Sequence, residues 1–344
     1  MIEVEALHLS EWIVPVLNLC ITIPLNFLTH KLWVYRKKSG QKRAIVTGAT
    51  GMLGAATVRA LLEDGYAVAA LVRPGSKRRD RLPDNPNLTV IEADLTDIAR
   101  AEPPPSEVWF HFAWDATLPD RRDDEAAQQR NVDDAPAALE KAAACACRRF
   151  VFAGSQAEYG IHRERVTERT PCDPVSAYGK AKLAFGAAGA EKAKALSMEF
   201  VHLRIFSVYG EEDRADSLVR GCVRTFLAGE DMRLGPATQT WNYLYAEDFA
   251  ALMVRVANAQ KAAGIYNVGG SDTRPLREFI EEIHALCGGN GRCLYGERPP
   301  RPEGEVRLDP DIMKVCAAFG WKPEVTFREG INRMIEAERK RQRV

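Results

Sequence analysis

The residues best suited to chemistry in this sequence are a tyrosine and a lysine four positions apart, Tyr178 and Lys182. On a helix this spacing places both side chains on one face. A phenol exchanges protons poorly at neutral pH because its pKa is about 10, and a neighbouring ammonium group lowers that pKa toward the working range. The pair therefore predicts proton transfer by Tyr178 with help from Lys182.

A third candidate is Ser155, which ends the apolar run FVFAGS and begins a turn. In an open parallel sheet, ligands bind at the carboxyl ends of the strands. A hydroxyl at that edge can hydrogen-bond the substrate oxygen that Tyr178 protonates. Taken alone, Ser155 could equally be a turn or helix-cap serine. Together the three residues predict a catalytic group of Ser155, Tyr178 and Lys182.

A glycine-rich sequence, GATGMLG, lies between a predicted strand and a predicted helix and contains Gly48, Gly51 and Gly54. The first glycine permits a tight turn, the second lets phosphates approach the backbone, and the third lets the helix pack closely on the strand. The amino end of the helix attracts the phosphates. The motif therefore predicts dinucleotide binding, with a plain turn as the less favoured alternative. Further backbone contacts are expected from Thr50, Met52 and Leu53.

The end of the second predicted strand indicates which dinucleotide is bound. A carboxylate there binds the adenosine 2′-hydroxyl group, whereas an arginine suits a 2′-phosphate. Here Arg73 and further basic residues follow the strand, and no acid does. Because Arg73 can pair with a phosphate, the sequence favours NADP, with a solvated basic loop as the alternative. Asp94 and Leu95 follow the third predicted strand, where the adenine ring is expected.

Apolar runs alternate with helical patterns through the first part of the chain, which predicts an α/β fold with a doubly wound parallel sheet. The predicted strands are 43–47, 67–72, 89–93, 108–113, 150–153, 200–206 and 264–269. The predicted helices are 53–64, 133–147, 178–196, 217–228 and 276–287.

The pattern changes after about residue 208 to turns and amphipathic helices, which predicts a smaller C-terminal substrate domain. We expect the dinucleotide-binding domain to span 41–208, with 236–270 returning to it. The substrate domain would then comprise 209–235 and 271–335. The charged stretch 336–344 is predicted to be a solvated tail.

Composition limits the classes of function. The 47 Lys and Arg residues balance 47 Asp and Glu residues, and this zero net charge argues against a nucleic-acid binder. The eight cysteines are scattered, without a CxxC pair or a Cys/His cluster at metal-ligand spacing. They predict reduced thiols in the cytoplasm and no metal site.

Residues 1–40 are predicted to be a membrane segment and linker. The apolar stretch 12–35 is long enough to cross a bilayer, and Lys31 is its only charge. Basic residues follow directly, which predicts a catalytic part attached to the inner face of the cell membrane. Two prolines leave a soluble or disordered leader as the alternative. The sequence PLNFLTHKLWVYR, within 12–36, resembles the last helix of GtrA-like membrane proteins, a trace that a misplaced start codon would also leave.

Over residues 42–335 the chain resembles the extended short-chain dehydrogenases, the NAD-dependent epimerase/dehydratase family. The matching sequences are TGATGMLG, ADLTD, HFAWDA, SQAEYG, YGKAK, LRIFSVYG, LYAEDFA and FGWKPEVTFREGI. The resemblance implies a Rossmann-type fold, hydride transfer at a nicotinamide, a homodimer through helices 133–147 and 178–196, and the catalytic group already inferred. It also implies cofactor contacts at Ala113, Tyr178 and Lys182. Substrate contacts are expected from Trp114, Gln156, Ser207 and Arg301.

Departures from the family pattern narrow the reaction. Sugar dehydratases of the family carry Asp-Glu after the catalytic serine or threonine, whereas Gln156 and Ala157 stand here. The pattern GSQAEYG with HFAW and FSVYG is most similar to nucleotide-sugar 4-ketoreductases such as the CDP-abequose synthase-like group. This resemblance implies NADPH-dependent reduction of a nucleotide-linked 4-keto-6-deoxysugar for cell-surface glycans. The alternatives are a nucleotide-sugar 4-epimerase with bound NAD and a non-catalytic NADP-binding regulatory module.

Overall fold

The computed structural model describes residues 40–299 and 307–342. The predicted membrane segment at 12–35 and the predicted substrate residue Arg301 lie outside these residues. Within them, no helix is both long and apolar enough to cross a membrane.

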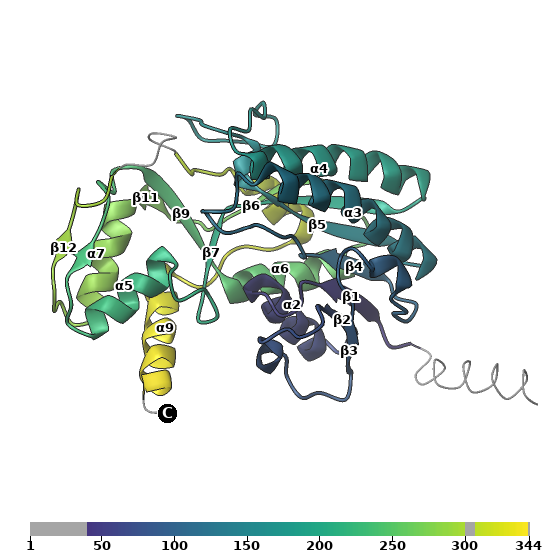
Figure 1. Ribbon diagram of the computed structural model, residues 1–344, viewed down its shortest axis with the longest axis horizontal. Coiled ribbons are helices and arrows are strands. Elements are labelled where there is room, and N and C mark those ends of the chain that lie inside the picture. The colour runs from purple at the N-terminus through teal and green to yellow at the C-terminus, as the bar shows by residue number, and fades with distance from the viewer. Residues whose placement is uncertain (1–39, 300–306, 343–344) are drawn as a thin grey trace, which may run out of the picture. The chain divides into compact units, whose positions relative to one another are not determined.

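Seven parallel strands form the central sheet in the order β10-β6-β5-β4-β1-β2-β3 (Figure 1). Their bounds are β1 Arg43–Thr47, β2 Ala67–Val72, β3 Leu88–Glu92, β4 Val108–His111, β5 Arg149–Ser155, β6 Glu199–Ile205 and β10 Gly264–Val268. The strand order reverses between β1 and β4, where Thr47 lies opposite His111. Ligands of such sheets bind at this switch point, beyond the carboxyl ends of the strands. The predicted doubly wound α/β fold is confirmed.

Helices cover both faces of the sheet, as Figure 1 shows. On one face lie α2 Met52–Glu63 and α6 Ala246–Asn258, and on the other lie α3 Glu125–Ala144 and α4 Ala177–Ala195. The side chains of β1 alternate accordingly, with Ala44 and Val46 in one apolar core and Ile45 in the other. Because both faces are buried, such strands read as uninterrupted apolar runs in the sequence.

Helix α3 begins at Glu125 rather than at residue 133, where the sequence predicts its start. Asp124 caps the helix by accepting the N–H of Ala127 at 3.0 Å. In its polar first half, Gln128 and Asn131 are buried: the Gln128 side chain donates to the carbonyl of Ala116, and Asn131 hydrogen-bonds the backbone of Asp115. The first half of α3 is therefore held by polar contacts and lacks the apolar periodicity from which the start of the helix was predicted.

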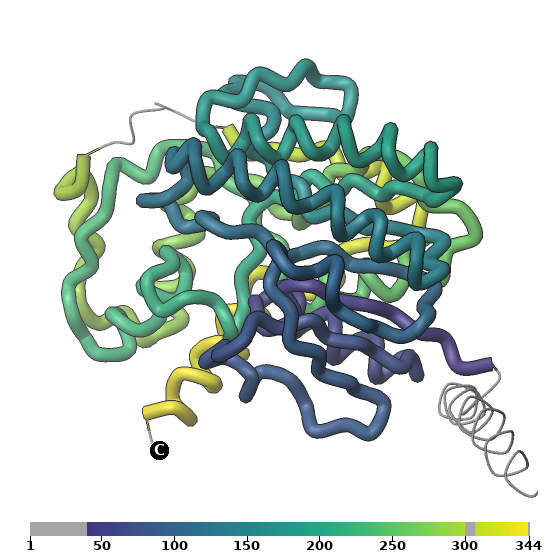
Figure 2. The backbone as a smooth tube through the Cα atoms, turned by 45° about the vertical axis from the view of Figure 1, so that its right-hand side comes forward, coloured from purple at the N-terminus to yellow at the C-terminus, as the bar shows by residue number. Residues whose placement is uncertain are grey.

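The C-terminal part of the chain builds a second lobe with its own core. Figure 2 shows green and yellow segments, distant in sequence, side by side in it. Its helices are α5 Leu218–Leu227, α7 Leu276–Leu286 and α9 Phe327–Gln342. Its small sheets contain β7 Ser207–Tyr209, β9 Thr240–Tyr245 and β11 Thr273–Pro275, and β8 Met232–Arg233 with β12 Cys293–Leu294. The remaining short helices are η1 Arg79–Arg81, η2 Ile98–Arg100, η3 Gln156–Glu158 and α8 Met313–Phe319.

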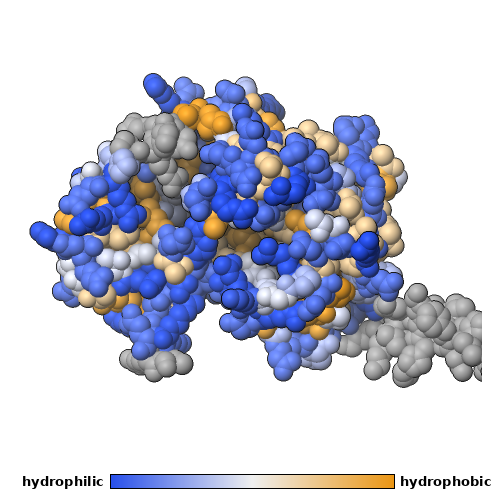
Figure 3. All heavy atoms as spheres, viewed as in Figure 1, coloured by the Kyte–Doolittle hydropathy of each residue, from blue (hydrophilic) through white to orange (hydrophobic). Residues whose placement is uncertain are grey.

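The charged stretch predicted as a solvated tail is helical up to Gln342. Glu338 is buried there and forms ion pairs with Arg220 of α5 and Arg341 of its own helix. The charge of Glu338 can therefore be buried, because Arg220 from another helix pairs with it. The face of the molecule in Figure 3 is mostly hydrophilic, and it is hollowed between the two lobes.

Candidate functional site

The glycine-rich turn joins β1 to α2, and the start of α2 beside it is only half-buried. Gly48 has a φ of +66°, and a Cβ atom there would lie 2.7 Å from the amide nitrogen of Ala113. A Cβ atom on Gly54 would lie 2.2 Å from the carbonyl oxygen of Gly48. Helix α2 starts after Gly51 without a side-chain cap, so its first N–H groups, those of Met52 and Leu53, face the turn without competition from a side chain. This cradle fits the diphosphate of a dinucleotide.

Two arginines flank the cradle on the side of β2. Arg73 follows β2, is exposed, and forms no ion pair within the described part of the chain. Arg81 donates to the carbonyl of Thr50 at 3.4 Å, and its Nε lies 3.8 Å from Glu212 Oε2. The Thr50 hydroxyl lies 3.3 Å from that of Ser76 in the loop after β2. No local pattern marks Arg81, because its approach to the turn depends on how this loop folds back.

The segments after β3 and β4 complete the same edge of the sheet. Asp94 Oδ1 accepts the N–H of Leu95 at 2.6 Å and closes the turn that follows β3. The N–H of Ala113 donates to the Thr47 hydroxyl at 3.3 Å, which holds the segment after β4 against the glycine turn. The predicted cofactor residues therefore come together at one edge, with Asp94 and Leu95 on the side of β2 and Ala113 at the switch point.

The structure brings Ser155, Tyr178 and Lys182 together. Ser155 ends β5, and Tyr178 and Lys182 lie one turn apart in α4. The Ser155 side chain acts on the Tyr178 phenol, because it opposes the rise that burial causes in the pKa of that phenol. The serine and tyrosine are each 8% exposed and the lysine is 2% exposed. This arrangement supports proton transfer at Tyr178 to an oxygen held by Ser155.

Ser155 also has the capping role that the sequence left open. Its side chain accepts the N–H of Ala157 at 3.2 Å, and its own N–H donates to Glu158 Oε1 at 2.8 Å. The reciprocal bonds form a capping box around η3. They fix the backbone of Ser155 without using its hydroxyl proton, so the structural and functional roles are compatible.

Lys182 is held by aromatic rings and one carbonyl group. Its Nζ donates to the carbonyl of Ala153 at 2.7 Å and lies 3.8 Å from the ring centroid of Trp114. The centroids of Phe152 and Tyr178 are 4.9 Å and 5.7 Å away. Burial lowers the pKa of Lys182 well below its usual value. Trp114, predicted to bind substrate, thus packs against Lys182.

Tyr178 faces a second cation that the sequence analysis did not identify. The guanidinium carbon of Arg122 lies 5.0 Å from the centroid of the Tyr178 ring. Burial raises the pKa of Tyr178, whereas Arg122 and the hydrogen bond from Ser155 oppose that rise. The sequence assigns this opposing role to Lys182, whose Nζ lies 5.7 Å from the centroid of the Tyr178 ring. No local pattern marks Arg122, because its contact depends on the loop between β4 and α3.

Comparison with known proteins places this geometry in a family. Residues 44–269 match the NAD dependent epimerase/dehydratase family. The chain belongs to that family. It is therefore an NAD(P)-dependent enzyme of the extended short-chain dehydrogenase type, as the sequence analysis predicted.

Most of the chain aligns with named nucleotide-sugar enzymes. It is 26% identical over 320 residues to UDP-glucose 4-epimerase of Mycolicibacterium smegmatis, covering 86% of this chain and 97% of that protein. It is also 26% identical over 199 residues to dTDP-4-dehydro-6-deoxyglucose reductase of Escherichia coli, covering 56% of this chain and 62% of that protein. The structure of Thermus thermophilus UDP-glucose 4-epimerase with NAD is 25% identical, with a TM-score of 0.76, covering 86% of this chain and 99% of that one.

Two of the predicted substrate residues of this family member lie at the edge of the sheet. Gln156 begins η3 directly after Ser155, and Ser207 begins β7 shortly after the end of β6. Both are half-buried. Because β5 and β6 are neighbours, their carboxyl ends bring these residues to the same edge.

A buried charged network lies behind Ser155 and was not predicted. Glu158 is fully buried, its Oε1 lies 3.0 Å from His202 Nε2, and its Oε2 accepts from Arg204 Nε at 3.0 Å. His202 and Arg204 interrupt the apolar sequence of β6, which was the available signal in FVHLRIF. Gly154 and Gly186 make room for the His202 ring, because a Cβ atom on either would lie within 2.4 Å of it.

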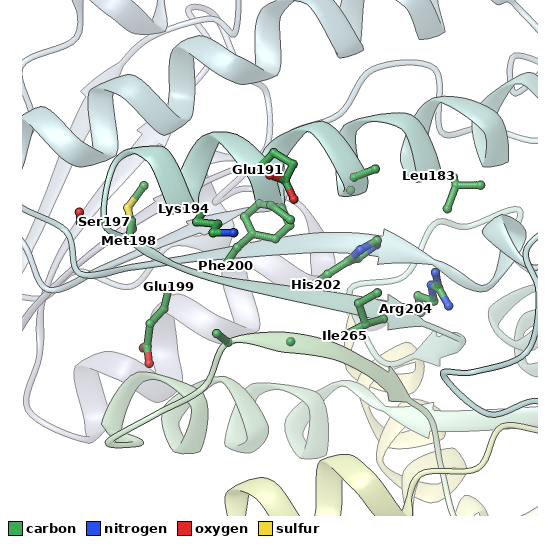
Figure 4. A pocket seen from close by; sticks show the side chains of 15 residues that line it. Leu183, Glu191, Lys194, Ser197, Met198, Glu199, Phe200, His202, Arg204 and Ile265 are labelled. Atoms are coloured by element: carbon green, nitrogen blue, oxygen red, sulfur yellow. The ribbon is translucent and has the colours of Figure 1, made fainter.

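A pocket of about 740 Å³ lies between α4 and the strands β6 and β10 (Figure 4). Its lining includes Leu183, Phe200, His202, Arg204 and Ile265. Ser155, Tyr178 and Lys182 do not line it. The pocket is therefore separate from the catalytic group, although His202 and Arg204 connect it to the buried network.

Proposed function

We propose that this protein is a nucleotide-sugar 4-epimerase. The observation that carries the proposal is that Ser155, Tyr178 and Lys182, three buried side chains from β5 and α4, lie together at the edge of the sheet that holds the glycine cradle. The named 4-epimerases support it because the chain covers nearly the whole length of the mycobacterial protein. The reductase matches a smaller part of the chain, so the comparisons favour epimerisation over the ketoreductase interpretation.

The chain's own residues supply proton transfer and orientation. A nicotinamide dinucleotide bound in the cradle supplies the hydride acceptor and donor. Tyr178 takes the proton from the hydroxyl at carbon 4 of the sugar during oxidation and returns it during reduction. Ser155 hydrogen-bonds the same oxygen, and Glu158 fixes the Ser155 backbone behind it.

Arg73 favours a second candidate, a nucleotide-sugar 4-ketoreductase that consumes NADPH. An enzyme that only reduces must exchange its dinucleotide after each turnover. The basic end of β2, with no acid beside it, suits the 2′-phosphate of NADPH. The same Tyr178 and Ser155 would then carry out the reductive half of the reaction alone.

One experiment separates the two functions. We expect the purified full-length protein to interconvert UDP-glucose and UDP-galactose, or another pair of 4-epimers, without added cofactor. Denaturation should then release a stoichiometric dinucleotide. Dependence on added NADPH with a panel of nucleotide-linked 4-keto sugars would instead establish the reductase. Absence of both activities would favour the non-catalytic binding module.

We further propose that Arg73 selects NADP over NAD. Arg73→Asp should weaken NADP binding by about 1.5–3 kcal/mol, roughly tenfold to a hundredfold, because it removes a charge-assisted hydrogen bond and repels the phosphate. NAD binding should improve or stay unchanged. Dissociation constants for both dinucleotides measure this, and Arg100→Asp is the control because Arg100 is a solvent-exposed arginine in η2. Equal affinity of the unmodified protein for NAD and NADP would show that the role assigned to Arg73 is wrong.

Assembly and attachment stay proposals. We propose a homodimer through α3 and α4, because the exposed side of α4 carries small residues that allow close helix packing, among them Ala184, Ala187 and Ala188. Attachment to the inner face of the cell membrane through residues 12–35 also stays a proposal.

A further inference from the structure

Arg122 lies in the loop between β4 and α3 and contacts the beginning of α4 in two ways. Its carbonyl oxygen accepts the N–H of Tyr178 at 2.9 Å, and its guanidinium carbon is 5.0 Å from the centroid of the Tyr178 ring. Its Nε donates to the carbonyl of Thr117 at 3.0 Å, which fixes the direction of the side chain. Asp123 adds a third link by accepting the N–H of Ala177 at 3.1 Å. The loop and the catalytic turn of α4 are therefore held as one unit.

The charge of Arg122 is not neutralised by an acid in the described part of the chain. The neighbouring Arg121 behaves differently, because its Nη2 lies 3.6 Å from carboxylate oxygens of both Asp115 and Asp124. Two adjacent arginines thus have different environments. One belongs to a surface ion-pair cluster, and the other directs its positive charge at a catalytic ring.

We propose that Arg122 is a positioning residue for Tyr178, which it holds in place and to which it presents the positive charge that favours the phenolate form. The inference rests on the proposed function in that Tyr178 is taken as the group that exchanges a proton with the sugar. A cation over the face of an aromatic ring is attracted by the ring itself, so the contact also stabilises the orientation of the tyrosine.

The other charged groups that face Tyr178 do not replace Arg122. Glu158, from η3, opposes ionisation of the phenol. Lys182, from the same helix, donates to the carbonyl of Ala153 and lies among aromatic rings. Ser155, from β5, contributes a neutral hydrogen bond. Arg122 is the largest of the influences that oppose burial, so the pKa of Tyr178 should move upward without it.

The test compares Arg122→Gln, which removes the charge, with Arg122→Lys, which keeps it. Each full-length protein is labelled with difluorotyrosine. Its phenol is more acidic than that of tyrosine, so the phenol titrates within the pH range in which the protein stays folded. Fluorine NMR then follows Tyr178, whose signal is assigned by its loss in Tyr178→Phe. Arg121→Gln is the matched control. Because no substrate is needed, this measurement succeeds or fails independently of the proposed reaction.

We expect the Tyr178 signal of Arg122→Gln to titrate at higher pH than in the unmodified protein, with Arg122→Lys and Arg121→Gln close to the unmodified value. Sugar oxidation by Arg122→Gln should likewise require higher pH. An unchanged titration in Arg122→Gln, with a raised KM for the nucleotide sugar, would make Arg122 a substrate ligand and overturn the proposal. Failure of Arg122→Lys to restore the titration would also overturn it, because the charge would then not be the cause.

Discussion

Tyr178→Phe should lower turnover of the nucleotide sugar by about 10²–10⁴-fold, the usual contribution of general acid–base catalysis. The substitution keeps the ring, its contact with Arg122 and its packing, and removes only the hydroxyl group that Ser155 hydrogen-bonds. Binding of the dinucleotide should persist because the glycine cradle is untouched. Turnover and cofactor affinity, measured on the same preparation, separate the loss of chemistry from a loss of binding.

The matched control is Tyr266→Phe. Tyr266 is also buried, but it lies on β10, and its hydroxyl donates to the carbonyl of Ala263 at 3.4 Å. We expect this variant to turn over normally. Normal turnover by Tyr178→Phe would refute the catalytic assignment and favour the interpretation as a binding module.

Glu158→Gln should destabilise the fold by about 3–5 kcal/mol, because removing one partner leaves buried charge without compensation. Glu158 is fully buried, and its carboxylate meets His202, Arg204 and the N–H of Ser155. Arg204 is only 4% exposed, so water cannot replace the lost carboxylate. The free energy of unfolding from denaturant titration measures the effect. Glu247→Gln is the control, since its ion pair with Arg333 is exposed and such pairs contribute about 0–1 kcal/mol.

The pH dependence of this effect has a defined sign. Burial opposes ionisation of Glu158, but His202, the Ser155 N–H and Arg204 together hold its pKa below the ordinary value of 4.5. The carboxylate therefore contributes its full stabilisation above that value and loses it as the pH falls through the pKa of the folded protein. The difference in stability between the unmodified protein and Glu158→Gln should narrow in acid. A difference that stays constant across this range would contradict the buried ion pair.

The sequence predicted the elements that depend on local patterns. The bounds of β1 and β2 coincide with the predicted ranges because both faces of these strands are buried, and continuous apolar runs mark them. Helix α6 was not predicted, although its buried residues Phe249, Leu252 and Val256 recur at helical spacing. Helix α3 was predicted too short because buried polar side chains, Gln128 and Asn131, hydrogen-bond a loop rather than following an apolar period.

The residues of the candidate site likewise include some that local patterns predict and others that only the folded chain brings together. Its glycines and the catalytic group could be found from spacing, because a tight turn needs glycine and one helical turn places Tyr178 and Lys182 together. Arg122 and Arg81 could not be found, because each reaches its contact across a loop. The partners of Glu158 left one signal, since His202 and Arg204 interrupt the apolar run FVHLRIF. Arg301 lies outside the described residues, so its role stays a prediction.

The sequence by itself determined the α/β class, the position of the glycine-rich turn and Tyr178 as the candidate for proton transfer, since these follow from short-range geometry and residue chemistry. Only the tertiary structure decided which charges surround that tyrosine. Lys182, predicted to act as its electrostatic partner, is enclosed by aromatic rings, and burial lowers its pKa well below the usual value. Arg122 comes from a separate loop to face the same ring. Electrostatic influence depends on distance and desolvation, and both are set by the packing of elements that are far apart in the chain.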